Sequence, residues 1–481
     1  MVFAIVFLLN AVANFLLGII LSALLGPAEF GRYATVALGA ATLATASFDW
    51  LRLSSIRFSG SYENREATSA SLDAGYIAMI GVSVVCVFAL LGAGLNFGLP
   101  ASLLALTPFM AIAYARSDYF AAHMRARDQG RAFALLAATR HSLTFTVVIG
   151  VAAAAPSAGP VVAALTATTL ISVVALGPAT RTPGTRLSLA NWRTIEQFVV
   201  YSKPIVASTV IYLAINLFDR HLALERFGAA ATGQLALATD LGLRLFLAIN
   251  VLPETLLFQY ALKRERDEGR PTAERQIAAN IVLIFAVLAP LTATYMAMAP
   301  TIEAVMAPAA FRGEYARLSF SLAPGFLAFC ALTSMCNPVL QLTKKTWPLT
   351  LAAVAALLAN LILVELPFFS ADIDGLAQAF AISLGVGFVA AAATAFRQSP
   401  IRPAARDMIV VAATAGVMGL VLRPLNAIHP PLLAAVLSLI LGGAILASSV
   451  LVFNVGGLRA MAAERLRSAG LRQAFAGRGE G

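Results

Sequence analysis

The sequence has little charge for its length. Only 12% of its 481 residues are Asp, Glu, Lys or Arg, whereas soluble globular proteins carry about 25%. Hydrophobic residues make up 59% of the chain, and the mean hydropathy is +0.83. This composition excludes an ordinary soluble domain and indicates a membrane protein.

Catalytic and metal-binding patterns are also scarce. The chain has three cysteines, Cys86, Cys330 and Cys336, which lie in apolar runs without the spacing of metal ligands. The histidines in or next to the connectors are not spaced for zinc with another His, Cys or carboxylate. No Ser/His/Asp set, Gly-rich phosphate loop or CxxC motif is present. The sequence therefore predicts neither an enzyme nor a bound cofactor, and leaves open only a coupling ion, H⁺ or Na⁺.

Long hydrophilic segments are missing as well. The longest stretches between or after apolar runs are 179–203, with 25 residues, and the tail 454–481, with 28 residues. Neither has room for a soluble domain. This argues against an ATP-driven exporter or a membrane-anchored glycosyltransferase, because both need one.

What the sequence does contain is fourteen long apolar runs. A membrane-spanning helix needs about 20 apolar residues, whereas the strands of a membrane β-barrel alternate in polarity. Runs such as LLGIILSALL are apolar on every side. We therefore predict an all-α polytopic membrane protein with about 14 transmembrane helices, at approximately 3–25, 34–51, 72–95, 101–120, 132–155, 160–178, 204–218, 233–258, 276–300, 318–340, 347–366, 375–396, 408–422 and 431–453.

The basic residues predict how these helices are oriented. Of the 34 Lys and Arg residues, 25 lie in alternate connectors and the tail, and only six lie on the opposite side. By the positive-inside rule, the side with 25 is cytoplasmic. Both termini are then cytoplasmic, and 454–481 is a basic cytoplasmic tail. Orientation thus accounts for the net charge of +10 without nucleic-acid binding.

Two connections between apolar runs resemble each other. One reads LLGPAEFGRYATVA and the other RFGAAATGQLALAT, at the same place in two sets of six predicted helices. Four small residues coincide at a constant offset of 202 residues: Gly26 with Gly228, Ala28 with Ala230, Gly31 with Gly233 and Ala34 with Ala236.

This repeat predicts the domain organisation. Duplicated bundles are typical of secondary transporters, in which the substrate path lies between the halves. We predict an N-terminal six-helix lobe at 1–203, a pseudo-repeated C-terminal six-helix lobe at 204–400 and two extra helices at 401–453. The alternative interpretation is that such glycines merely suit a tight turn into a helix.

The segment LLGPAEFGRYATVALGAA (24–41) resembles the first loop and second helix of bacterial polysaccharide and O-antigen flippases. Segments 215–242, 303–317 and 374–385 are similar to other parts of the same family. The resemblance implies the fold of the multidrug/oligosaccharidyl-lipid/polysaccharide exporter superfamily, with two six-helix lobes around a central cavity. It also implies a polyprenyl-diphosphate-linked oligosaccharide as substrate, which alternating access moves to the outer leaflet of the bacterial inner membrane. Surface-polysaccharide polymerase and export machinery would be its partners.

A charged residue in the middle of a membrane helix is rare and points to function. Arg244 lies near the centre of the run 233–258, and Asp240 lies four residues earlier on the same helical face. We expect these two side chains to pair. Either the pair is purely structural, or Arg244 also binds a substrate diphosphate, for which a guanidinium group is well suited.

Three further polar residues lie inside predicted spans. Arg140 either extends to the cytoplasmic surface or faces the cavity. Asn10 and Asn14 share one helical face, and either form hydrogen bonds between helices or line a sugar path.

Charged residues also mark the ends of two predicted spans. Asp49 and Arg52 lie near a cytoplasmic end, and Asp219 and Arg220 near an outer end. We expect the four at the two mouths of the cavity, or simply solvated at the membrane interface. Asp118, close to a cytoplasmic end, is expected as an interfacial anchor.

These observations predict a flippase for a lipid-linked glycan. A cation-coupled drug antiporter of the same superfamily is the first alternative, and would use membrane-embedded carboxylates, for which only Asp240, Glu254 and Glu365 are candidates. The second alternative, a polysaccharide polymerase or ligase, normally needs a large outer loop, whereas the outer loops here reach only about 17 residues.

Overall fold

The computed structural model describes residues 2–58, 65–94, 98–180, 185–343, 346–457 and 459. All regular structure within these ranges is helical. The longer helices are α1 (Val2–Phe58), α2 (Arg65–Gly92), α3 (Ala101–Ala126), α4 (Gly130–Leu143), α6 (Ala158–Thr180), α7 (Trp192–Glu268), α8 (Arg270–Ala297), α10 (Glu314–Ala331), α12 (Trp347–Leu363), α14 (Ile373–Gln398), α15 (Ala405–Leu422) and α16 (Pro431–Phe453).

Short helical pieces extend or connect these helices. The π-helical turns η1 (Thr144–Val148) and η4 (Leu332–Cys336) continue α4 and α10 into α5 (Ile149–Ala154) and α11 (Asn337–Leu342). The remaining pieces are α9 (Ala299–Met306), α13 (Pro367–Ser370) and the 3₁₀ turns η2 (Leu187–Leu189), η3 (Ala309–Phe311), η5 (Arg423–Ala427) and η6 (Val455–Gly457).

Ten helical stretches in the described ranges are long and apolar enough to cross a membrane, as a multi-pass membrane protein requires. The predicted runs 3–25 and 34–51 share α1, and 204–218 and 233–258 share α7, so each pair counts once. Helix α12 is apolar but shorter. Helix α3 is not among the ten, because charged residues in its second half lower its hydropathy. The number of fourteen and the cytoplasmic termini remain predictions.

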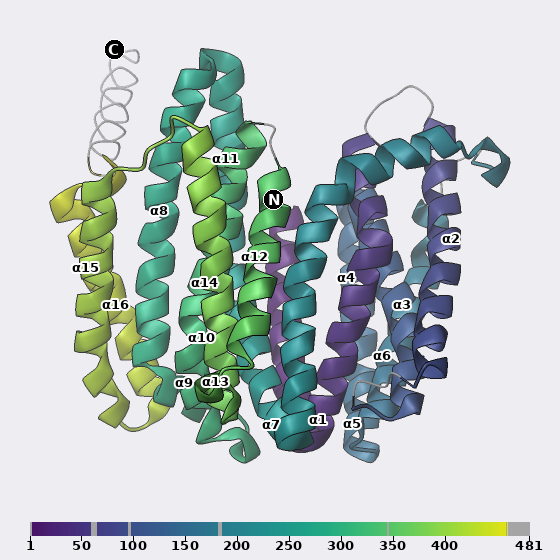
Figure 1. Ribbon diagram of the computed structural model, residues 1–481, viewed down its shortest axis with the longest axis horizontal. Helices are drawn as coiled ribbons and strands as arrows, with labels where there is room; N and C mark the ends of the chain where they lie inside the picture. Colours follow the sequence, from purple (N-terminus) through teal and green to yellow (C-terminus); the bar gives the residue numbers. More distant parts are fainter. Residues whose placement is uncertain are drawn as a thin grey trace, which may run out of the picture.

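Helices α1 and α7 each break at one glycine. The dihedral angles are φ 68° and ψ 173° at Gly26, and φ 85° and ψ 175° at Gly228. Glycine adopts a positive φ without the steric cost that a side chain adds. The residues matched in sequence thus adopt the same backbone geometry, which turns each helix into two arms that run in opposite directions (Figure 1).

The arms meet immediately after these breaks. A Cβ atom at Gly233 would lie 1.9 Å from the carbonyl oxygen of Pro27, and one at Gly31 would lie 2.4 Å from that of Ala229. Only glycine at these positions lets the two backbones come so close. The contact joins α1 to α7 at the bottom of Figure 1.

The other helices surround this pair in two groups. Helices α2 to α6 lie on one side of α1 and α7, and α8 to α14 on the other, with α15 and α16 packed outside α8 (Figure 1). The connector 399–404, predicted to be cytoplasmic, lies at the top, whereas α9 and α13 lie at the bottom. The predicted boundary at 203 falls inside α7. Nearly all of the predicted tail 454–481 lies outside the described residues.

Candidate functional site

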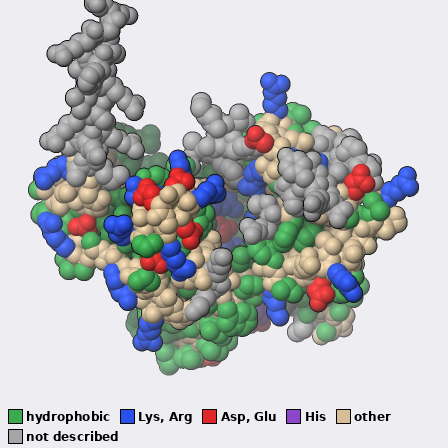
Figure 2. Space-filling view, turned by 90° about the horizontal axis from the view of Figure 1, so that it is seen from above, with side chains coloured by type: hydrophobic (Ala, Val, Ile, Leu, Met, Phe, Trp, Pro, Cys, Tyr) green, Lys and Arg blue, Asp and Glu red, His purple; other side chains and the backbone are tan. Residues whose placement is uncertain are grey.

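The candidate cavity is lined by α1, α3, α4, η1 and α6, and by the second arm of α7. Seen from above, the molecule is hollowed between the two groups of helices, with Lys or Arg side chains inside the hollow (Figure 2). Two adjoining pockets share Arg140 in their walls, and a third adds Asp49. We call these three pockets the central cavity.

The first arm of α1 brings two polar side chains to the cavity. Asn10 and Asn14 line adjoining pockets, as expected for residues on one helical face. The amide oxygen of Asn10 is hydrogen-bonded to Nε2 of His141 from α4. Asn10 therefore forms a hydrogen bond between helices while it lines the cavity, and its contact with sugars stays a prediction.

Arg140 faces the cavity from α4. Its Nη1 donates to the hydroxyl of Ser117 on α3 at 3.1 Å, and the side chain lines both larger pockets. The π-helical turn η1 begins four residues later, and Thr144 at its start lines the same wall. Single-turn π-bulges inside helices are frequent at functional sites.

Asp49 and Arg52 lie at the upper end of the second α1 arm. The guanidinium group of Arg52 donates to both carboxylate oxygens of Asp49, at 2.8 and 2.9 Å. Both side chains line the central cavity. Their place at a mouth of the cavity stays a prediction.

The expectation that Asp240 pairs with Arg244 is wrong. Asp240 instead accepts from Nη2 of Arg220, which lies twenty residues earlier on the other arm of α7. Arg244 donates from Nη1 to the backbone carbonyl of Asn14 at 2.7 Å. The side chains of Asp240 and Arg244 do share one cavity wall, but the break at Gly228 brings a second arginine to the carboxylate.

Asp219 and Arg220 are not at a solvated mouth either. Their exposed fractions are 2% and 1%. Asp219 accepts a hydrogen bond from Nδ2 of Asn360 on α12 at 3.1 Å, and its other oxygen has no hydrogen-bond partner within the described chain. The expectation fails because the first arm of α7 packs between α1 and α12.

The sequence also missed cavity residues on α3. Asp118, expected as an interfacial anchor, lines two of the pockets, and Arg125 lines one. Tyr114, Asp118, Ala121 and Arg125 are spaced by four, three and four residues and all face the cavity. This helical periodicity was the available signal.

The charges of the cavity are unequally neutralised. Asp49 pairs with Arg52, and Asp240 with Arg220. Among the described residues, no carboxylate lies within ion-pair distance of Arg140 or Arg244, although both line the same pocket. Two guanidinium groups thus have donors available to a ligand, and anionic oxygens such as those of a phosphate are the acceptors that bind guanidinium most strongly.

No family model matches the sequence, and no curated protein is significantly similar to it. Solved structures do share the fold. Lipid II flippase MurJ, in an inward closed conformation, matches with a TM-score of 0.72 at 11% identity, covering 94% of this chain and 98% of that one.

Multidrug-resistance transporters of the MATE family match as well. An inward-facing member of the MOP superfamily gives a TM-score of 0.61 at 14% identity, covering 81% of this chain and 94% of that one. A eukaryotic MATE transporter gives 0.53 at 11% identity, covering 86% and 97%. The chain therefore has the all-helical fold of MOP-superfamily transporters.

Proposed function

We propose that the protein is a flippase that moves a polyprenyl-diphosphate-linked oligosaccharide across the bacterial inner membrane. The observation that carries this proposal is the pair of cavity arginines without a carboxylate partner, Arg140 and Arg244. A diphosphate offers several anionic oxygens, and each guanidinium can donate two parallel hydrogen bonds.

The shape of the cavity supports transport rather than catalysis. The cavity is hollowed from the side predicted to be cytoplasmic (Figure 2), and the opposite end is closed by the contact of Gly31 with Gly233. An alternating-access transporter in its inward-facing state has this arrangement. Asn10 and Asn14 would contact the sugars, and the substrate would serve the synthesis of surface polysaccharide or lipopolysaccharide.

A drug antiporter is the second candidate, favoured by the fold shared with MATE transporters. A cationic drug and a coupling cation need a carboxylate in the cavity. Asp240 is bound to Arg220 and Asp49 to Arg52, and Glu365 pairs with Arg226 outside the cavity. The side chain of Glu254 lies outside the described residues. Asp118 also lines the cavity and has no ion-pair partner within the described chain. The lining carboxylates are nevertheless outnumbered by the lining arginines, with Asp49, Asp118 and Asp240 against Arg52, Arg125, Arg140 and Arg244. The net positive charge of this lining favours an anionic substrate.

Reconstitution tests the proposal. Liposomes containing the purified chain and a lipid-diphosphate oligosaccharide are assayed for the appearance of the glycan on the opposite leaflet. The variant with both Arg140→Gln and Arg244→Gln should lose most of this activity. The matched control is Arg226→Gln, which removes an arginine bonded to Val364 and Glu365.

Equal flipping by the double variant and by wild type would refute the role of these arginines. Efflux of a cationic dye that depends on H⁺ or Na⁺, with no glycan flipping, would establish the antiporter instead.

A further inference from the structure

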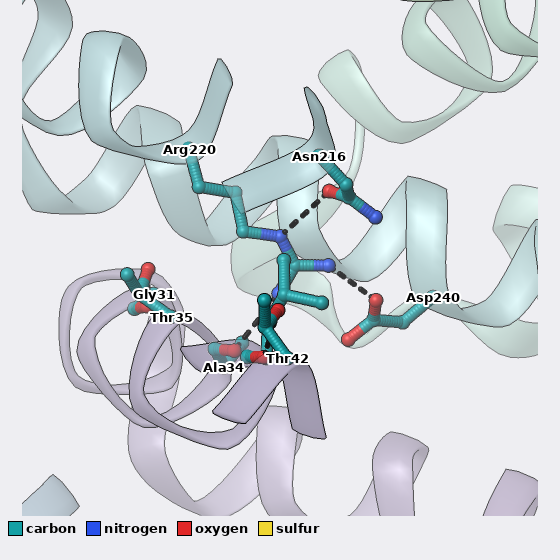
Figure 3. Close-up of polar contacts among 8 residues, drawn as sticks. Gly31, Ala34, Thr35, Thr42, Asn216, Arg220 and Asp240 are labelled. Carbon is teal, nitrogen blue, oxygen red and sulfur yellow. Dashed lines mark hydrogen bonds and ion pairs between the residues drawn. The ribbon is translucent and has the colours of Figure 1, made fainter. Parts of the chain in front are cut away.

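Arg220 is the largest fully buried side chain of the described molecule, yet it does not line the central cavity. All three nitrogens of its guanidinium group donate hydrogen bonds. Nε donates to Asn216 at 3.2 Å, Nη1 to the backbone carbonyl of Ala34 on α1 at 2.9 Å, and Nη2 to Asp240 (Figure 3). The group is thus fixed between three segments that meet near the breaks of α1 and α7.

Asp240 has two arginines within reach. Arg220 comes from the first arm of α7, and Arg244 lies one helical turn beyond Asp240 on the second arm, where residues four apart are neighbours. The carboxylate side chain is 27% exposed and belongs to the cavity wall. It can therefore turn toward either guanidinium group, and in the structure it binds Arg220.

Arg244 is directed away from Asp240. Its Nη1 binds the carbonyl oxygen of Asn14 and lies 3.3 Å from where a Cβ atom of Gly18 would be. The absence of a side chain at Gly18 leaves room for this approach. A backbone carbonyl carries no net charge, so the positive charge of Arg244 stays available to an anion in the cavity.

We propose that Arg220 is a positioning residue for the anion site: it holds the Asp240 carboxylate and thereby keeps Arg244 available to the ligand. This inference rests on the proposed function, because it concerns the same anion. Without Arg220, the carboxylate would turn to Arg244 and compete directly with the diphosphate for the same guanidinium donors. If the ion pair were only structural, ligand binding would not depend on Asp240 in this way. Its role would then be stability, to which buried ion pairs add little net free energy.

A binding experiment with two compensating substitutions tests the proposal. Farnesyl diphosphate serves as the probe and is titrated into the purified full chain in detergent. Arg220→Gln should weaken binding by about tenfold, which corresponds to about 1.4 kcal/mol, because Asp240 then neutralises Arg244. Adding Asp240→Asn to Arg220→Gln should restore most of the affinity, because no carboxylate is left to compete.

Asp240→Asn alone provides a second variant, in which Arg220 is kept. The amide oxygen of an asparagine can still accept from Arg220, and the cavity gains net positive charge. Binding should therefore tighten by about two- to threefold. Gel filtration and thermal unfolding of each variant separate misfolding from lost affinity.

The outcomes separate the inference from the function on which it rests. If Arg220→Gln binds like wild type, or the double variant stays as weak as Arg220→Gln, the positioning role is wrong while the anion site stands. Weaker binding by Asp240→Asn would contradict it equally, because Asp240 would then assist the ligand. If Arg244→Gln binds the probe as tightly as wild type, the anion site itself is wrong and the inference falls with it.

Discussion

The two halves of the molecule share a long helix that breaks at a glycine, but their interiors contain different side chains. In the N-terminal half, α1, α3 and α4 bring Arg52, Asp118, Arg125 and Arg140 to an open cavity. The C-terminal half contains a core of aromatic rings. Phe246 lies 5.5 Å from Phe326 and 5.6 Å from Tyr295 between ring centroids.

Some polar groups inside the C-terminal half are paired with each other. The hydroxyl of Ser334 donates to the side-chain oxygen of Asn250 at 2.7 Å, and the hydroxyl of Tyr295 donates to Ser319 at 3.3 Å. The matched glycines at the breaks therefore preserve one geometry, while the side chains have become specialised. The N-terminal half supplies most of the charged cavity lining, whereas the C-terminal half adds Asp240 and Arg244 from α7 and a packed support behind them.

The largest expected effect comes from a substitution at the close contact between α1 and α7, next to the glycine breaks that the halves share. Gly233→Ala places a Cβ atom 1.9 Å from the carbonyl oxygen of Pro27, so α1 and α7 must move apart. Overpacking of this kind typically costs about 1–3 kcal/mol, and we expect a clearly lower midpoint of thermal unfolding in detergent. Gly443→Ala on α16 is the control, because nothing lies within 4 Å of its Cβ position. Equal midpoints for the two variants would show that the arms are not in close contact.

A smaller effect is expected from charge at the upper end of the cavity. Arg52 is already paired with Asp49, so Arg52→Gln should reduce the affinity for farnesyl diphosphate by only about threefold, less than the loss of Arg140 or Arg244. Its main consequence should be slower association, because charges lining a cleft steer ligands by long-range attraction that salt screens. Stopped-flow association rates at low and high salt measure this.

Arg226→Gln in the C-terminal half is the control for Arg52→Gln. Arg226 donates to Val364 and Glu365 outside the cavity, and its loss should leave the association rate and its salt dependence unchanged. If both variants slow association equally, the charge asymmetry between the halves has no role in binding.

Much of the fold follows from the sequence, because lipid allows few alternatives. Backbone groups in a bilayer must be satisfied internally, so each long apolar run predicts a helix. Polar side chains are also unfavourable in contact with lipid, so the few polar residues of these runs are expected to face protein or water. This is why one cavity could be predicted for Arg140, Arg244, Asn10 and Asn14. Gly26 and Gly228 lie at matching positions of the two similar connections, and this match likewise predicted a repeated turn.

Contacts across the breaks could not be read from the sequence. The rule that residues four apart interact favours Arg244 as the partner of Asp240. Arg220 reaches the carboxylate only because α7 folds back at Gly228, and local spacing contains no information about that approach. The place of Asp118 in the cavity wall could not be predicted for a related reason: its distance from the end of a span says nothing about which neighbouring helices it faces.

The smallest effect should follow from neutralising the buried carboxylate of the C-terminal half. One oxygen of Asp219 and the side-chain oxygen of Asn360 both lack a hydrogen-bond partner among the described residues. In Asp219→Asn, the new amide can donate to Asn360 while still accepting from it, and no charge remains buried. We expect the free energy of unfolding to rise by about 0.5 kcal/mol, measured as a higher unfolding midpoint, with unchanged binding of farnesyl diphosphate. Weaker binding would contradict this expectation, because the interior between α7 and α12, which does not line the cavity, would then act on the ligand.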